Sequence, residues 1–276
     1  MEHPFITNIK IRKISNNEAL DTNDQLAIEE PLEIQLQYGV ADKRVNKSIS
    51  VTMRTPGHDW ELATGFLFTE GIIRNNQEIL FIEQDDDDIN KIVVGLQEDV
   101  FPDIQKLERN FYTTSSCGVC GKSSIDAIKT VSVHNNEPDT IRLKAEMFYC
   151  LHDIVRERQA IFDTTGGLHA SALFDLEGNF VTLREDVGRH NALDKLTGSA
   201  LLNEQLPLSN NILLLSGRAS FELIQKASMA GIKVVTAVGA PSSLAVELAK
   251  ELNITLIGFL RDERFNIYSG EQRIMM

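Results

Sequence analysis

The chain has few cysteines and no long apolar segment. Only three of its 276 residues are cysteine, an odd and small number that excludes a disulfide framework and suits a reducing compartment. No stretch approaches the roughly 20 apolar residues that a membrane-spanning helix needs. The first 16 residues also lack the apolar core of a secretory signal. We therefore expect a cytoplasmic protein that does not enter a membrane.

An excess of basic residues is lacking as well. Lys and Arg number 27 against 40 Asp and Glu, which gives a net charge of −13. A protein whose main partner is DNA or RNA carries a basic face, so we expect no nucleic-acid partner. The sequence has no complete Gly-x-x-x-x-Gly-Lys-Ser/Thr phosphate loop and no Gly-x-Gly-x-x-Gly element, which excludes an ordinary ATPase or NAD site.

Apolar residues are plentiful at 42%, enough for a sizeable core in one large domain or two modest ones. The first third has a β-rich pattern. Residues 47–55 alternate with Ile49, Val51 and Met53 on one face, which predicts a half-buried strand. Asp59 is placed to cap the helix that follows, and Gly71 is placed to end it.

The middle of the chain predicts one long helix over residues 145–162. Cys150 lies on its apolar stripe, so we expect this cysteine to pack in the core. Residues 170–175 and 180–184 flank a turn sequence and predict a hairpin. A helix is expected over residues 191–202.

The last third alternates apolar strands with helices. Strands are expected at 211–216, 233–238 and 254–260, and helices at 219–230 and 242–252. This order predicts a parallel sheet covered on both faces, with ligands gathered outside the carboxyl ends of its strands.

Three arginines stand at that predicted edge: Arg218, Arg261 and Arg264. In so acidic a chain they indicate a site for a phosphate or another polyanion. The alternative is that they pair with neighbouring acids such as Asp262 and Glu263. Spacing alone leaves both interpretations open.

The segment 185–191, Glu-Asp-Val-Gly-Arg-His-Asn, follows a strand and opens a helix. Such a turn can bring Arg189 and His190 to the edge of a cleft. The alternative is a helix start whose acidic residues favour the helix dipole. His169, which leads into a strand, suits either a structural or a functional role.

Cys117 and Cys120 form a Cys-Gly-Val-Cys pair in a stretch of Ser, Thr and Gly. A zinc site would need two further ligands, and no second cysteine pair exists. A structural disulfide disagrees with the expected compartment. A redox pair and a sulfur-transfer pair, in which a thiolate carries sulfur as a persulfide, both remain open.

These motifs together resemble the FdhD family of sulfurtransferases required for formate dehydrogenase activity. The resemblance covers nearly the whole chain beyond the first few dozen residues. It is carried by Arg54–Gly57, Gly65–Leu67, Glu70–Gly71, Cys117–Gly121, Thr165–His169, Arg184–Lys195, Ser216–Arg218 and Gly258–Phe259.

The resemblance implies an enzyme that takes sulfur from a cysteine desulfurase. Cys117 would carry it as a persulfide and Cys120 would assist or accept it. The sulfur would go to the molybdenum bis(molybdopterin guanine dinucleotide) cofactor, bound as a substrate and destined for formate dehydrogenase. No permanently bound metal is expected. The residues expected to bind the cofactor are Phe259, Leu260, Arg261, Asp262, Glu263, Arg264, Gly217, Arg218 and His190.

The resemblance also implies an α/β fold whose C-terminal domain is similar to cytidine deaminases, and a homodimer. Deaminase chemistry is not expected, because His169-Ala170-Ser171 lacks the glutamate of the zinc motif. We expect a β-rich N-terminal subdomain at 1–115, a mobile loop and connection at 116–137, and the deaminase-like domain at 138–276. Two other functions remain open: a non-catalytic chaperone of the cofactor, and a redox protein.

Overall fold

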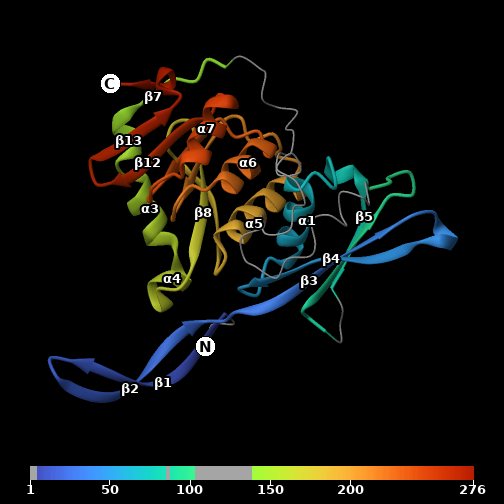
Figure 1. Ribbon diagram of the computed structural model, residues 1–276, viewed down its shortest axis with the longest axis horizontal. Coiled ribbons are helices and arrows are strands. Elements are labelled where there is room, and N and C mark those ends of the chain that lie inside the picture. Colours follow the sequence, from blue (N-terminus) through green and yellow to red (C-terminus); the bar gives the residue numbers. More distant parts are fainter. Residues whose placement is uncertain (1–4, 85–87, 103–138) are drawn as a thin grey trace.

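The computed structural model of the chain describes residues 5–84, 88–102 and 139–276. A four-stranded sheet from the first third of the chain and a six-stranded sheet from the last third make up its body. Helices α1 (Asp59–Thr69) and α5 (Arg189–Leu202) pack against each other between these sheets (Figure 1). Among the described residues, no helix is long and apolar enough to cross a bilayer. The expected loop at 116–137 lies outside this range, so the domain boundaries around it stay a prediction.

The four-stranded sheet confirms the β-rich start of the chain. Its strands are β3 (Glu30–Tyr38), β4 (Val45–Arg54), β5 (Ile79–Gln84) and β6 (Lys91–Leu96), in the order β4-β3-β6-β5. Short 3₁₀ helices lie at Ala41–Lys43 and Asn76–Glu78. Helix α1 covers one face of the sheet. The core between them contains Leu32, Ile34, Leu36, Ile92, Val94 and Leu96 from the strands, and Leu62, Ala63 and Leu67 from the helix.

The expected alternation along β4 is wrong beyond Ile49. Ile34 of β3 pairs with Ser50 and Gln35 pairs with Ser48, so Ile49 is an extra residue in the ladder. Such a bulge reverses the face to which the following side chains point. As a result Ile49 is buried, whereas Val51 and Met53 are 62% and 45% exposed.

Helix α1 ends as expected but begins differently. Its N-cap is His58, in a left-handed conformation with φ 57°, and its side chain makes no capping hydrogen bond. Asp59 does not cap the helix, because its carboxylate accepts hydrogen bonds from Nε and Nη2 of the buried Arg54 at 3.0 and 3.1 Å. Gly71 follows the helix with φ 72°, a conformation that glycine adopts without strain.

The six-stranded sheet has the order β13-β12-β11-β10-β8-β9. Its strands are β8 (His169–Asp175), β9 (Phe180–Asp186), β10 (Asn211–Leu215), β11 (Val234–Ala237), β12 (Thr255–Arg261) and β13 (Arg264–Ser269). Strands β10, β11 and β12 are parallel, and β8 and β9 form the expected hairpin. Because β8 runs antiparallel to β10 and β13 antiparallel to β12, the sheet is mixed.

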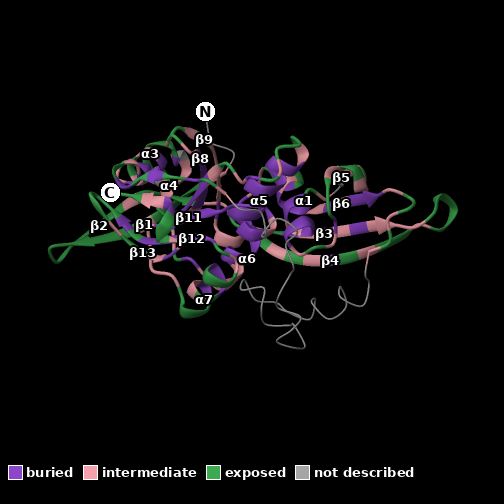
Figure 2. Ribbon diagram, turned by 90° about the horizontal axis from the view of Figure 1, so that it is seen from above, coloured by how far each residue is buried: buried purple, intermediate pink, exposed green. Residues whose placement is uncertain are grey.

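Both faces of this sheet are covered, as expected. Helices α5, α6 (Phe221–Met229) and α7 (Ser243–Glu251) enclose a core on one face. The other face packs against a 3₁₀ helix (Ala145–Phe148) and α3 (Leu151–Arg158). Coloured by burial, α1 and α5 form a largely buried layer between the sheets (Figure 2).

The single helix expected at 145–162 is wrong. The chain there forms the 3₁₀ helix, α3 and a separate short helix, α4 (Ala160–Thr165). Just before them, β7 (Leu143–Lys144) pairs with the C-terminal strand β14 (Ile274–Met275), which follows a 3₁₀ helix at Glu271–Arg273. The change of helix type shifts the apolar stripe, so Leu151 and Val155 are buried while Cys150 is exposed. The expectation that Cys150 packs in the core is therefore wrong.

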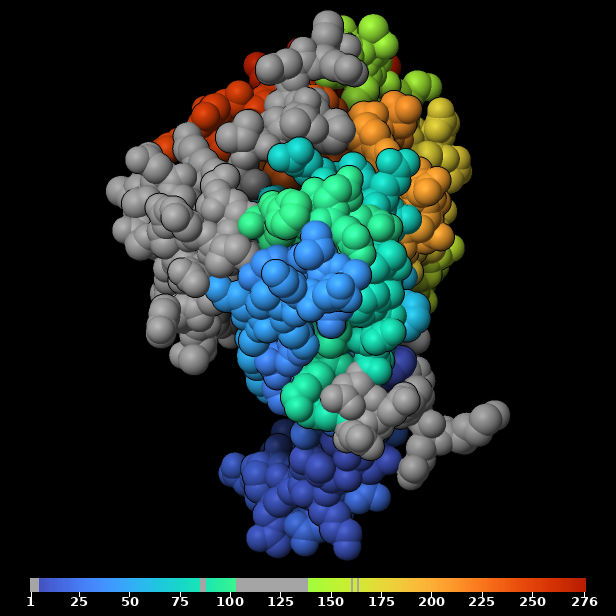
Figure 3. Space-filling model, turned by 90° about the vertical axis from the view of Figure 1, so that its right-hand side faces the viewer, coloured from blue at the N-terminus to red at the C-terminus, as the bar shows by residue number. Residues whose placement is uncertain are grey.

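The first described residues form an antiparallel hairpin of β1 (Ile6–Ser15) and β2 (Glu18–Ala27). It extends away from the body of the molecule (Figures 1 and 3). We refer to residues 6–27 as the N-terminal arm.

Candidate functional site

The carboxyl ends of the parallel strands meet at one edge, where the site was expected. Gly239, beyond β11, donates its N–H to the carbonyl of Gly217, beyond β10, at 2.9 Å. Phe259 of β12 in turn donates its N–H to the carbonyl of Gly239 at 3.2 Å. A Cβ on Gly239 would lie 3.0 Å from Cγ of Arg218. The backbone therefore brings Gly217, Arg218 and Phe259 together.

Phe259 has an unusual backbone. Its φ is 55°, in the left-handed region that a bulky residue rarely adopts, and the pairing of β12 with β13 shifts register between Gly258 and Arg261. This irregularity directs the side chain outward, so that 42% of Phe259 is exposed. Leu260 is completely buried in the core on the other face, so only its main chain is available to a ligand.

The remaining expected residues of this segment form the turn between β12 and β13. Arg261 pairs with Arg264 across the hairpin, and Asp262 and Glu263 lie between them, all four exposed. Asp262 has a φ of 47°. Within the part of the chain that the structure describes, Arg261 and Arg264 form no ion pair, and neither does Arg218. The alternative that these arginines are neutralised by Asp262 and Glu263 is not observed.

Two histidines border the same edge. His169 begins β8 and pairs with Asp186, the last residue of β9. A Cβ on Gly217 would lie 3.2 Å from Nδ1 of His169, so the absence of a side chain there leaves room for the ring. Burial lowers the pKa of His169, and the positive charge of Arg189 lowers it further. The negative charge of Asp186 raises this pKa but does not outweigh the other two effects. A neutral imidazole is thus favoured at neutral pH.

His190 lies in the first turn of α5, and its Nε2 is 3.3 Å from Oγ of Ser220, the N-cap of α6. Glu222 lies nearby, with Oε2 at 3.9 Å from the same nitrogen. Arg189 has a buried Nε without a hydrogen-bond partner. Sequence reasoning overlooked Ser220 and left His169 open. Only the position of each at the start of a helix or strand could have indicated them.

The segment 185–191 owes its shape to a buried network. Asp186 accepts hydrogen bonds from the N–H of Gly188 at 2.8 Å and from the side chain of Asn191 at 3.1 Å. Its other oxygen lies 2.7 Å from Nζ of Lys195 and accepts the N–H of Thr55 at 3.2 Å. Burial raises the pKa of Asp186, and the Lys195 charge opposes this. Asp186 and Asn191 therefore hold the turn, while Arg189 and His190 reach the edge.

Cys117 and Cys120, the expected catalytic pair, lie outside the residues that the structure describes. Cys150, in contrast, is exposed at the start of α3, with Sγ 3.5 Å from the carbonyl of Met147. Among the described residues, no three His, Cys, Asp or Glu side chains are arranged to hold a metal ion.

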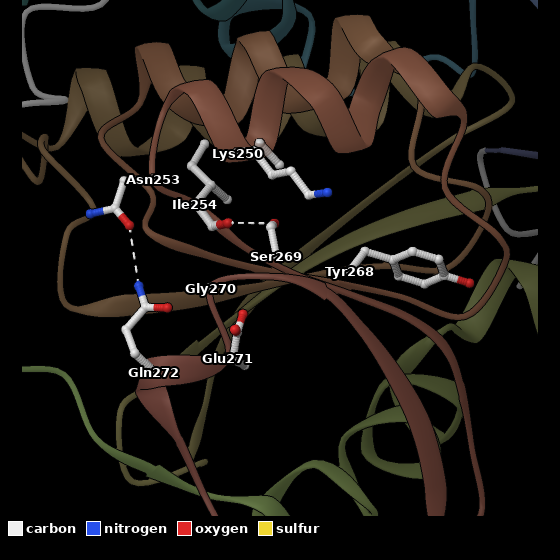
Figure 4. A pocket seen from close by; sticks show the side chains of 9 residues that line it. Lys250, Asn253, Ile254, Tyr268, Ser269, Gly270, Glu271 and Gln272 are labelled. Carbon is white, nitrogen blue, oxygen red and sulfur yellow. Dashed lines mark hydrogen bonds between the residues drawn. The ribbon is translucent and has the colours of Figure 1, made fainter.

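Two surface pockets lie elsewhere. One of about 390 Å³ is at the opposite edge of the six-stranded sheet, between the end of α7 and the end of β13 (Figure 4). Its polar lining includes Lys250, Asn253 and Gln272. Another of about 580 Å³ adjoins the start of α1, beside His58 and Trp60. Neither of these two pockets is lined by an expected cofactor-binding residue.

Comparisons with known proteins agree with these features. The model of the FdhD/NarQ family matches residues 27–275. The sulfur carrier protein FdhD of Streptomyces avermitilis is 49% identical, covering 97% of this chain and 95% of its own. That of Picrophilus torridus is 43% identical, covering 91% of this chain and 92% of its own. A crystal structure from Desulfotalea psychrophila, described as a formate dehydrogenase accessory protein, superposes with a TM-score of 0.74 at 25% identity. It covers 99% of this chain and 100% of its own. The chain therefore belongs to the FdhD/NarQ family.

Proposed function

We propose that this protein is a sulfur carrier in the maturation of formate dehydrogenase. The observation that carries the proposal is the near full-length similarity to proteins named sulfur carrier protein FdhD. The Cys-Gly-Val-Cys pair of the sequence supplies the thiols that such a role requires.

The proposed chemistry is sulfur transfer through Cys117. Its thiolate attacks the terminal sulfur of a persulfide on a cysteine desulfurase, and the thiolate of the donor leaves. Cys117 then carries one extra sulfur as a persulfide, with no net oxidation or reduction. Cys120 assists the transfer or accepts the sulfur in turn. Finally, an electron pair of the acceptor attacks the terminal sulfur, the S–S bond breaks, and Cys117 leaves as a thiolate.

The proposed acceptor is molybdenum bis(molybdopterin guanine dinucleotide), bound as a substrate at the edge that holds Gly217, Arg218 and Phe259. Arg218, Arg261 and Arg264 are exposed and unpaired in the described chain, which suits the pyrophosphates. The exposed ring of Phe259 offers a face on which a guanine can stack. In this proposal the six-stranded sheet and its helices form the deaminase-like domain, used for binding and not for deamination.

The decisive experiment is intact-protein mass spectrometry after incubation with a cysteine desulfurase and cysteine, without reductant. We expect a gain of about 32 Da for each transferred sulfur, lost in Cys117→Ala. Cys150→Ala is the matched control, because this exposed cysteine is remote in sequence from the pair and should leave the gain intact.

The competing function is that of a chaperone that binds the cofactor without carrying sulfur. It predicts that formate dehydrogenase activity in cells survives Cys117→Ala and is lost on replacement of Arg218. An active Cys117→Ala variant would exclude the sulfur-carrier mechanism.

A further inference from the structure

Positive charge without a partner surrounds His169 at the edge where the parallel strands end. Arg189 lies in the first turn of α5, which contains no acidic residue, and its Nε is buried without a hydrogen-bond partner. The main-chain N–H groups of that turn add positive partial charge. Within the described residues neither Arg189 nor Arg218 forms an ion pair. The part of the chain that the structure describes therefore leaves this charge without an anion.

His169 is placed to contact a ligand at this edge. It begins β8 and lies against Gly217, where a Cβ would be 3.2 Å from Nδ1 and 3.4 Å from Cε1 of the ring. The residue is only partly buried, and its ring nitrogens form no hydrogen bond within the described chain. Each of these nitrogens is able to donate or accept a hydrogen bond, according to its protonation. His169 thus offers an unused polar group beside Gly217.

The carboxylates near His169 are bonded to other groups. Asp186 faces it across the β8–β9 pair, but both oxygens of Asp186 belong to the network around Lys195. Glu222, in the first turn of α6, has Oε2 at 3.9 Å from Nε2 of His190. Since neither carboxylate forms an ion pair with His169, an anion that pairs with this histidine has to come from a ligand.

The charges of the chain itself favour the neutral form of His169. Its pKa is lowered by burial first and by the Arg189 charge second, and Asp186 opposes both. A phosphate bound by Arg189 brings negative charge next to the imidazole, which cancels the repulsion and favours the protonated ring. The proton comes from the solvent and adds to the unprotonated ring nitrogen. The ligand then faces a histidinium as well as the guanidinium groups.

We propose that His169 is an anion-binding residue of this edge and takes up a proton as a pyrophosphate ligand binds. The inference rests on the proposed function, because it takes the edge that holds Gly217, Arg218 and Phe259 as the binding site. It adds a property that arginines cannot supply. Arginine keeps its charge at every accessible pH, whereas a histidine that is protonated on binding makes the affinity rise as the pH falls.

The first test is calorimetry with diguanosine pyrophosphate as the probe. Its pyrophosphate is esterified at both ends, so it lacks the terminal phosphate proton with a pKa of about 6. Wild type should bind the probe about 3- to 10-fold more tightly at about pH 6 than at about pH 8. The binding heat should also differ between two phosphate-free buffers of unequal ionisation enthalpy, since proton uptake by the protein takes a proton from the buffer.

The variants assign this proton to one histidine. His169→Gln should lose both the pH dependence and the buffer dependence, because glutamine forms hydrogen bonds but does not titrate here. His190→Gln should keep both effects even where its affinity is lower. His152→Gln is the matched control and should behave like wild type, because α3 covers the other face of the sheet. Circular dichroism verifies that each variant is folded.

The second test is nuclear magnetic resonance of selectively labelled wild type, which needs no variant. The chain has six histidines, whose ring signals are assigned through main-chain connectivity. The pKa of His169 should rise when the probe is bound, whereas that of His152 should stay the same.

Each failure has its own signature. The inference is overturned, and the binding edge retained, if the probe binds equally at both pH values or if His169 titrates identically with and without it. A pH dependence that survives in His169→Gln overturns it too. No binding at either pH overturns both the inference and the proposed cofactor site. Failure of the sulfur-carrier role shows in a different measurement, the mass gain at Cys117.

Discussion

Lys195 and Asp186, both completely buried, form an ion pair at 2.7 Å that joins α5 to the end of β9. The same two side chains also form hydrogen bonds with the two main-chain groups of Thr55. Lys195 donates to its carbonyl at 2.8 Å, and Asp186 accepts its N–H at 3.2 Å. The pair therefore connects Thr55, the residue that follows β4, with α5, the helix that carries His190 to the candidate site.

Replacing Lys195 by Met should strongly destabilise the fold. The change leaves the Asp186 carboxylate buried without its cation, a loss of about 3–5 kcal/mol in the free energy of unfolding. Urea denaturation followed by circular dichroism measures it. The double variant Lys195→Met, Asp186→Asn should recover part of the loss, since no charge is then buried. A single variant as stable as wild type would contradict the assigned role.

Gly65 and Gly198 should not tolerate even a methyl group. A Cβ on Gly65 would collide with the carbonyl of Asp194, and one on Gly198 with the carbonyl of Glu61. Because the opposing atoms are backbone, α1 and α5 would have to separate, and each change to Ala should cost about 3 kcal/mol or more. Gly167→Ala is the control, because its nearest new neighbour is 3.9 Å away. Thermal unfolding that ranks the three variants equally would refute the close helix crossing.

Glu61 should make stability depend on pH in the acidic range. Burial alone would raise its pKa, but hydrogen bonds from Arg184 and His58 outweigh this and lower it from 4.5 to about 2. A carboxyl whose pKa is lower in the folded state stabilises the protein above its unfolded pKa. That contribution is lost as the pH falls from about 4.5 toward 2.

The measurement for Glu61 is urea denaturation of wild type and Glu61→Gln between about pH 6 and pH 2.5. At the upper limit the variant should be less stable by about 1–2 kcal/mol, a value reduced because the ion pair is partly solvated. The difference should shrink toward the lower limit. Glu177→Gln, in the exposed turn between β8 and β9, serves as control and should show no such trend. A constant difference for Glu61→Gln would disprove the assignment.

Phe259→Gly should separate stability from ligand binding. Glycine adopts the φ of 55° without strain, so the free energy of unfolding should stay within about 1 kcal/mol of wild type. Loss of the stacking surface should weaken binding of guanosine diphosphate by about 10- to 100-fold in calorimetry.

The matching change at the anion site is Arg218→Gln, which should weaken binding of guanosine diphosphate by about 10- to 100-fold. Arg156→Gln, on the exposed side of α3, should bind the nucleotide like wild type. Unchanged affinity in both Phe259→Gly and Arg218→Gln would place the nucleotide away from this edge.

The spacing of apolar residues along the sequence predicted some helices and strands correctly and others wrongly. The three parallel strands and their helices followed directly from short apolar runs and helical spacing, and sheet geometry predicted that Gly217, Arg218 and Phe259 lie at one edge. The alternation along β4 failed because one bulge at Ile49 depends on how β3 pairs with it. The long helix at 145–162 failed because its break into a 3₁₀ turn and two α-helices leaves no signal in the apolar spacing.

What the sequence determined by itself is the chemistry that is available. The cysteine pair, the arginines that follow the strands and the excess of acid are properties of the chain in any conformation. Only the tertiary structure decided which groups meet. The hydrogen bonds that Lys195 and Asp186 form with Thr55, the contact between Gly65 and α5, and the proximity of His169 to Gly217 join segments tens to more than a hundred residues apart. Such contacts depend on packing geometry, which local spacing does not encode.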